Sequence, residues 1–200
     1  MPRYAQQAAA GPKVGVLALQ GDFREHAEVL LALDAVPVEL RAADDVAGVD
    51  ALVLPGGEST TISMLLESSG LFGALDEALR AGVPTLATCA GLILLAASVG
   101  RGRSDQRSFG VLDVAVERNG YGRQVQSFET PLSIEALGGA RFPAVFIRAP
   151  LITSTGDGVE VMASVDGRPV LVRQGPILAA TFHPELSGDL RLHQLFVGGA

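Results

Sequence analysis

Short apolar runs alternate with amphipathic stretches along most of this chain. The apolar runs are nearly continuous, which is typical of strands buried on both faces of a parallel sheet. They lie at Lys13–Leu19, Ala51–Leu54, Val83–Thr88 and Ile177–Phe182. The amphipathic stretches predict helices near residues 22–33, 59–68, 71–81 and 190–197. This alternation predicts an α/β fold, a three-layer flavodoxin-like sandwich with a mostly parallel central sheet.

The middle of the chain has a different pattern. Between Val111 and Arg173, short extended runs are separated by glycine, proline and charged turns, which predicts a small antiparallel extension of the sheet. Residues 102–108, with the neighbouring arginines, are expected to form a solvated loop. Residues 1–12 are rich in Ala, Gln, Gly and Pro and are expected to form an N-terminal tail. Residues 13–200 are then expected to form a single domain.

Cys89 is the single cysteine, and it lies where an apolar strand runs directly into the helix-like stretch Leu92–Ala97. The small residues around it, Ala87, Ala90 and Gly91, allow a tight strand-to-helix turn of the kind that presents nucleophiles in hydrolases. The first N–H groups of the following helix would favour a thiolate and stabilise an oxyanion. The alternative is that Cys89 is a small core residue.

A histidine ends the last apolar strand, in Phe182-His183-Pro184-Glu185. Pro184 favours an extended conformation at His183, and in extended chain the side chains of residues i and i+2 point to the same side. Glu185 could therefore bind one imidazole nitrogen and leave the other to take the proton of Cys89. The alternative is a solvated histidine at a strand end, followed by a helix-starting glutamate.

A glycine turn, Pro55-Gly56-Gly57-Glu58-Ser59, follows the apolar strand that ends at Leu54. Its backbone N–H groups could bind an anion, and Ser59 or Thr60 could cap the next helix. A phosphate loop is an alternative, but no lysine follows the glycines, as the Walker pattern requires. Glu58 would repel phosphate and suits a substrate that carries an ammonium group.

These motifs, in this order, resemble the class I glutamine amidotransferases. Three further stretches narrow the resemblance to the glutaminase subunits of bacterial pyridoxal 5'-phosphate synthases, over about residues 14–196. They are Leu19-Gln20-Gly21-Asp22-Phe23-Arg24-Glu25-His26, Val116-Glu117-Arg118-Asn119-Gly120-Tyr121-Gly122-Arg123-Gln124 and Phe146-Ile147-Arg148-Ala149-Pro150. Many class I domains carry glycine two residues before the nucleophile, where this chain has Ala87.

The resemblance implies a role for each matching residue. Cys89 is expected to attack the glutamine side-chain amide, His183 to pass a proton to the departing ammonia, and Glu185 to orient His183. The backbone N–H groups of Gly57 and Ala90 match the oxyanion-hole positions. The positions that match those holding glutamine are Gly57, Glu58, Ser59, Arg118, Ile147 and Arg148. A zwitterionic substrate needs a guanidinium for its carboxylate, although Arg118 and Arg148 could also be ordinary surface charges. Arg148 follows the run 144–147, and ligands tend to bind at strand ends of a parallel sheet.

Composition narrows the classes of partner. The net charge of −7 with 15 basic residues argues against nucleic acid as a partner. No apolar run reaches the roughly 18 residues of a membrane span, and a single thiol suits a reducing compartment, so the cytoplasm is the expected location. The three histidines have no metal-ligand spacing, and no metal or cofactor is expected.

The ammonia must reach a second polypeptide, because the chain is too short to hold a synthase as well. By resemblance, the expected partner is the barrel-shaped synthase subunit that makes pyridoxal 5'-phosphate from ribose 5-phosphate and glyceraldehyde 3-phosphate. Gln20 to Asp22 and the Gly56-Gly57 turn are the expected sites at which this partner switches the glutaminase on. The alternatives are a cysteine hydrolase for another amide and a non-catalytic interaction subunit with the same fold.

Overall fold

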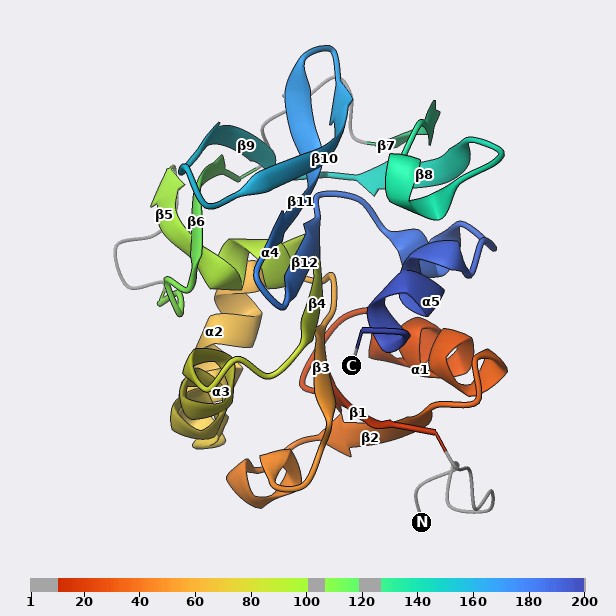
Figure 1. Ribbon diagram of the computed structural model, residues 1–200. Helices are drawn as coiled ribbons and strands as arrows, with labels where there is room; N and C mark the ends of the chain where they lie inside the picture. Colours follow the sequence, from red (N-terminus) through yellow and green to blue (C-terminus); the bar gives the residue numbers. More distant parts are fainter. Residues whose placement is uncertain (1–10, 101–106, 119–126, 200) are drawn as a thin grey trace.

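A computed structural model describes residues 11–100, 107–118 and 127–199, and most of the predicted tail and loop lie outside these ranges. Within them, the central sheet has seven strands in the order β10-β11-β12-β4-β3-β1-β2 (Figure 1). Its strands are β1 (Lys13–Leu17), β2 (Val36–Leu40), β3 (Ala51–Leu54), β4 (Thr85–Thr88), β10 (Glu160–Val165), β11 (Arg168–Gln174) and β12 (Ile177–Ala180). The helices are α1 (Phe23–Ala32), α2 (Ser59–Ser68), α3 (Leu71–Arg80), α4 (Ala90–Leu95) and α5 (Arg191–Val197).

Strand pairing confirms the predicted α/β fold. β12, β4, β3, β1 and β2 pair in parallel, whereas β11 and β10 extend the sheet in antiparallel fashion beyond β12. Pro37 lies in β2 at the edge of the sheet, where the missing N–H costs no ladder hydrogen bond. Pro12, the last residue of the predicted tail, pairs with this edge, because its carbonyl accepts a hydrogen bond from the N–H of Val36 at 2.9 Å.

Two smaller sheets flank the carboxyl end of the central sheet. One contains β5 (Ala96–Gly100), β6 (Leu112–Glu117) and β9 (Leu151–Thr155), and the other contains β7 (Ser127–Leu132) and β8 (Phe142–Ile147). The described residues also form three short 3-10 turns, η1 (Ala43–Val46), η2 (Glu135–Leu137) and η3 (Pro184–Leu186). The predicted antiparallel character is present in the pairs β6–β9 and β7–β8, whereas β5 and β6 pair in parallel.

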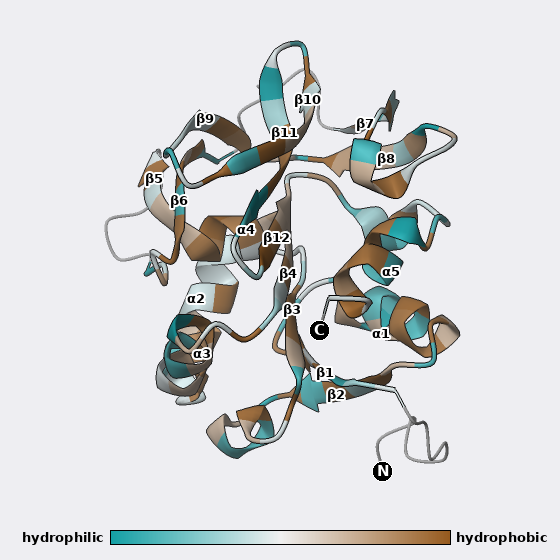
Figure 2. Ribbon diagram, viewed as in Figure 1, coloured by the Kyte–Doolittle hydropathy of each residue, from teal (hydrophilic) through white to brown (hydrophobic). Residues whose placement is uncertain are grey.

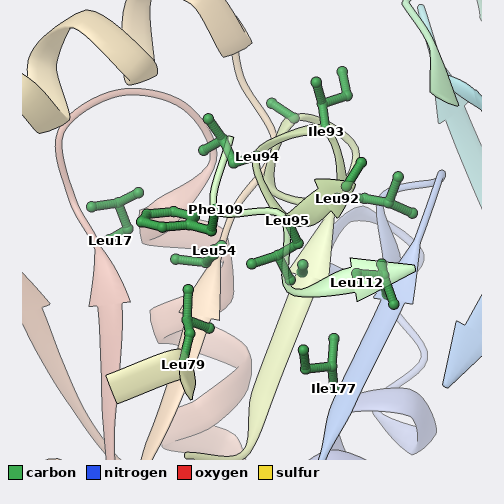
Figure 3. Packing of buried hydrophobic residues seen from close by; sticks show 14 of the residues in the cluster. Leu17, Leu54, Leu79, Leu92, Ile93, Leu94, Leu95, Phe109, Leu112 and Ile177 are labelled. Carbon is green, nitrogen blue, oxygen red and sulfur yellow. The ribbon is translucent and has the colours of Figure 1, made fainter. Parts of the chain in front are cut away.

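Side chains of the central strands alternate between two hydrophobic cores. Leu54 of β3 belongs to the core under α2, α3 and α4, whereas its neighbour Val53 belongs to the core under α1 and α5. Figure 1 shows these two groups of helices on opposite faces of the sheet, and Figure 2 shows the sheet strands β3, β4 and β12 in hydrophobic colours. Figure 3 shows the first core, where Leu54, Leu92 and Phe109 lie among the labelled side chains. Each fully buried leucine contributes about 1.5–3 kcal/mol of transfer free energy.

Helix α4 lies unusually close to the sheet. A Cβ atom on Gly91 would lie 2.0 Å from the carbonyl oxygen of Leu54, so only glycine allows this approach of α4 to β3. The close packing fixes the start of α4 directly above the end of β4. Among the described residues, none of the helices has the length and hydrophobicity needed to cross a membrane.

Candidate active site

Cys89 lies at a sharp turn between β4 and α4, as the sequence predicts. Its backbone has φ 47° and ψ −100°, a strained conformation for a residue with a Cβ. The N–H of Cys89 donates to the carbonyl of Ala180 at 2.9 Å, which continues the β4–β12 pairing to the nucleophile itself. The turn forms with alanine at position 87, and α4 begins at Ala90, two residues earlier than predicted.

His183 faces the thiol from the chain that leaves β12. Its backbone N–H donates to the carbonyl of Val145 at 2.8 Å, which fixes the chain against β8. The imidazole Nδ1 lies 2.7 Å from Oε1 of Glu185, so the contact predicted from the i, i+2 spacing is present. The same Nδ1 lies 3.3 Å from Oδ2 of Asp22. Cys89 and His183 are 7% and 4% exposed, so both reacting groups are largely shielded from bulk water.

The charges around His183 favour its protonated form. Burial opposes this form, but hydrogen bonds to Asp22, Cys89 and Glu185 and the charge of the thiolate raise the pKa of His183 to about 12. Burial raises the pKa of Glu185, whereas the hydrogen bond and charge of His183 oppose that rise. The arrangement is therefore that of a protonated imidazole between the sulfur of Cys89 and the carboxylate of Glu185.

A cavity of about 380 Å³ opens above Cys89 and His183. Nearly all the predicted site residues line it, namely Gly57, Glu58, Ser59, Cys89, Arg118, Ile147, Arg148 and His183, together with Gln20, Gly21, Asp22 and Ile93. Glu185 lies behind His183, and Ala90 is the first residue of α4, where backbone N–H groups have no partner within the helix. A hollow of about 500 Å³ at the other end of β4 and β12 has no thiol, histidine or carboxylate side chain among its described lining residues. The smaller cavity is therefore the candidate active site.

Glu58 caps helix α2, a role that the sequence analysis assigned to Ser59 or Thr60. Its carboxylate accepts from the N–H groups of Thr60 and Thr61 at 3.2 and 2.7 Å and from the Thr61 hydroxyl at 2.8 Å. It also accepts from Nη2 of Arg118 at 2.6 Å, and Nη1 of Arg118 donates to Thr60 at 2.7 Å. Although desolvation opposes it, these backbone and hydroxyl donors, with Arg118, lower the pKa of Glu58 to about 2.

This capping changes what Glu58 can do for a substrate. Four donors match the roughly four lone-pair positions of a carboxylate, so an incoming ammonium group would have to displace one of them. Arg118 is held in one orientation at the cavity and presents a cation there. Ser59 is buried, and its hydroxyl has no hydrogen-bond partner among the described residues.

Ile147 and Arg148 reach the cavity from β8 rather than from the parallel sheet. Arg148 follows a strand, as expected, but among the described strands β8 pairs with β7 alone and in antiparallel fashion, so the expectation that this strand belongs to the parallel sheet was wrong. The carbonyl oxygen of Ile147 lies 4.0 Å from Sγ of Cys89. Arg148 has φ 44°, an unfavourable conformation for a residue with a side chain, and this turn brings it to the cavity.

The sequence analysis assigned no catalytic role to several polar groups at the site. Asp22 follows the Gln20-Gly21 turn and contacts His183, while His26 and His193 lie buried behind Glu185. Asp22, His183 and Glu185 each place one polar atom within 4.8 Å of the others. The same atoms already form the hydrogen bonds that orient His183, and the spacing of His26 and His193 in the sequence gave no signal of their contact.

The chain was then compared with known proteins. The sequence profile of the SNO glutamine amidotransferase family matches residues 16–199. The chain belongs to this family, in agreement with the resemblance drawn from its motifs.

Close relatives share one name, pyridoxal 5'-phosphate synthase subunit PdxT. The relative from Frankia casuarinae is 55% identical over 94% of each chain, and that from Kosmotoga olearia is 51% identical over 92% of this chain and 96% of its own. A crystal structure described as a glutamine amidotransferase is 48% identical, with a TM-score of 0.87 over 93% of this chain and 97% of the other. The structure of PurLQS from Thermotoga maritima shares the fold at 16% identity, with a TM-score of 0.70 over 94% of this chain and 98% of the other.

Proposed function

We propose that this chain hydrolyses L-glutamine to L-glutamate and ammonia, and that it is the glutaminase subunit of a pyridoxal 5'-phosphate synthase. The observation that carries the proposal is the line of Cys89, His183 and Glu185 at the base of a cavity whose wall holds an oriented arginine. Membership of the glutamine amidotransferase family and the shared name of the close relatives support the same substrate and the same assembly.

The reaction proceeds through a glutamyl thioester. The thiolate of Cys89 attacks the side-chain amide carbon, a C–S bond forms, and the carbonyl oxygen becomes an oxyanion held by the backbone N–H groups of Gly57 and Ala90. The C–N bond then breaks, and His183 gives its proton to the leaving nitrogen, which departs as ammonia. Water next attacks the thioester, His183 takes its proton, and the C–S bond breaks to give glutamate. Glu185 keeps the imidazole in position throughout.

Substrate selection falls to the wall of the cavity. Arg118 binds the α-carboxylate of glutamine, because its guanidinium is the oriented cation there and pairs with carboxylates. Glu58 holds Arg118 in place, and it contacts the ammonium group only if one of its four present donors is displaced. Gly57, Ser59, Ile147 and Arg148 complete the glutamine site.

The ammonia passes to a synthase subunit, which we propose is barrel-shaped and combines it with ribose 5-phosphate and glyceraldehyde 3-phosphate. The Gly56-Gly57 turn is a suitable place for that subunit to act, because Oε1 of Gln20 accepts from the N–H of Glu58 at 2.8 Å and so ties this turn to the Gln20-Gly21 turn. A change in either turn would alter the oxyanion site.

The test is glutamate and ammonia release from glutamine by this chain, measured with and without the cognate synthase subunit. We expect release that the partner stimulates and that Cys89→Ala abolishes. In Arg118→Lys, KM for glutamine should rise about tenfold or more with a smaller change in kcat, because a charged hydrogen bond contributes about 1.5–3 kcal/mol. No release from a verified complex would refute the glutaminase. Release of ammonia from unrelated amides at equal rates, unaffected by Arg118→Lys, would instead indicate a general amide hydrolase.

A further inference from the structure

Two buried histidines stand behind Glu185, on the side away from the cavity. His26 of α1 and His193 of α5 are both 0% exposed, and neither lines the cavity. Nδ1 of His26 lies 2.9 Å from Nε2 of His193, although 167 positions separate the two residues. Nε2 of His26 lies 3.3 Å from Oε2 of Glu185 and 3.2 Å from the hydroxyl oxygen of Thr88. The pair therefore connects directly to the carboxylate that orients His183.

Both histidines are neutral at pH 7. Burial and the charges of His193 and His183 hold the pKa of His26 well below its usual value, and burial lowers the pKa of His193 to about 4. Each ring thus has one N–H donor and one lone pair. The contacts between them and Glu185 then depend on which nitrogen of His26 has the proton.

The surroundings select one arrangement of protons. If Nδ1 of His26 had the proton, the lone pair on Nε2 would face the carboxylate of Glu185, which is repulsive. If Nε2 has the proton, it donates toward Glu185 and Thr88, and Nδ1 accepts from the Nε2–H of His193. Nδ1 of His193 has no hydrogen-bond partner among the described residues in either arrangement, so the two arrangements differ in what Nε2 of His26 presents to Oε2 of Glu185. An orphaned lone pair is a smaller penalty than a lone pair facing a buried carboxylate.

The buried carboxylate of Glu185 needs a second hydrogen-bond donor, besides His183, to stay ionised. Its side chain is 0% exposed, and burial raises its pKa, which favours the neutral acid. Oε1 already accepts from His183, whereas Oε2 has no full hydrogen bond within the described residues, and the N–H of His26 lies against it at 3.3 Å. The charged and titratable groups that face Glu185 are His183, His26 and Asp22, and those that face His26 are Glu185, His193 and His183.

We propose that His26, oriented by His193, is a positioning residue of the glutaminase reaction, which keeps Glu185 ionised and aimed at His183. This inference rests on the proposed function. It assigns to α1 and α5 a part in catalysis that lies outside the substrate cavity. His26 touches no substrate, so its loss should lower kcat while leaving KM for glutamine nearly unchanged.

Two polar substitutions of similar kind test the proposal in the complex with the synthase subunit. In His26→Gln, the amide nitrogen can replace Nε2 and donate to Glu185, whereas in His26→Asn the shorter amide replaces Nδ1 and cannot reach it. We expect His26→Asn to lower kcat roughly 10–100-fold, the usual effect of losing such a support. We also expect the acid limb of the pH profile of kcat to move to higher pH in His26→Asn, because Glu185 with one hydrogen-bond donor fewer is more easily protonated. His26→Gln should stay within about threefold of wild type, and His193→Leu should shift the acid limb in the same direction by less.

Several outcomes would overturn the proposal. Equal losses in His26→Gln and His26→Asn, or an acid limb that does not move in His26→Asn, would indicate a purely structural role. If neither variant folds, nitrogen NMR of the wild-type chain decides, because the proposal requires the proton of His26 on Nε2, and a proton on Nδ1 would refute it. Wild-type turnover separates the two hypotheses: a complex that releases no ammonia refutes the proposed function, while the NMR result tests the hydrogen-bond chain independently of turnover.

Discussion

Gly56→Ala should slow the enzyme by moving His183, the proposed catalytic histidine. Gly56 is buried beside the triad, and its φ is not in the left-handed region, so its backbone conformation is open to alanine. A Cβ at this position would lie 2.4 Å from Cε1 and 2.9 Å from Nδ1 of His183, and 2.9 Å from Oδ2 of Asp22. The added methyl group would therefore meet the imidazole before any other part of the site.

The size of the effect follows from that distance. Ordinary carbon contacts begin near 3.4 Å, so the imidazole must move by about 1 Å. A misplacement of about 1 Å in a catalytic group can reduce the rate roughly 100-fold, which corresponds to about 2.7 kcal/mol of activation free energy. We expect kcat/KM to fall by about this factor. The cost in stability should be smaller than the several kcal/mol of a disrupted core, because the strain can be relieved at one side chain.

The assay is glutamate release by the complex, with urea unfolding of each variant as the control for folding. Gly73→Ala is a suitable comparison, because Gly73 lies inside α3 and a new Cβ there would meet no described atom within 4 Å beyond the nearby backbone of its own helix. It should keep full activity and gain about 0.5–1 kcal/mol in the free energy of unfolding. A folded Gly56→Ala variant with activity within threefold of wild type would show that His183 does not need its observed position.

Two further predictions concern charge. Glu58 has a lowered pKa, so its ionised form stabilises the fold above pH 4.5, and this stabilisation is lost as the pH falls toward about 2. The Glu58 side chain is 43% exposed, which weakens its interactions. We therefore expect Glu58→Gln to lower the free energy of unfolding by only about 1 kcal/mol at pH 7. Urea unfolding should show that this difference narrows below pH 4.5, and a constant difference would contradict the capping role. His183 has a raised pKa, so its contribution is complete below pH 6.5 and is lost only as the pH rises through about 12. Nitrogen NMR of the wild type should find the His183 ring protonated at pH 8. In Cys89→Ala the ring should lose its proton at a lower pH than in the wild type. A neutral ring at pH 7 in the wild type would contradict the prediction.

The parallel core of the fold could be predicted because its strands are buried on both faces. Ala51–Leu54 was predicted with the bounds that β3 has, and α2 with its bounds Ser59–Ser68. The direction of strand pairing in the middle of the chain could not be predicted, because short extended runs look alike in parallel and antiparallel sheets. β5 and β8 illustrate this: one pairs in parallel and the other in antiparallel fashion.

The candidate site was predicted where residue types are close in sequence or lie in a recognisable motif. The contact of His183 with Glu185 follows from local geometry, whereas the contact of Glu58 with Arg118 joins residues 60 positions apart. A glutamate before a helix is also an uncommon cap, so Ser59 and Thr60 were the natural candidates. The buried pair of His26 and His193 joins helices from distant parts of the chain, and only the packing of α1 and α5 on one face brings them together.

The position of β12 beside β4 has a consequence for the growing polypeptide. Cys89 is synthesised together with the turn between β4 and α4. His183 and Glu185 follow almost half of the chain later, after all strands of the central sheet have been made. Until β12 occupies the gap next to β4, the thiol has no base and the cation at His183 is absent. An unfinished chain on the ribosome therefore holds Cys89 without the histidine that faces it, and the candidate site is assembled only after the last strand, β12, has joined β4.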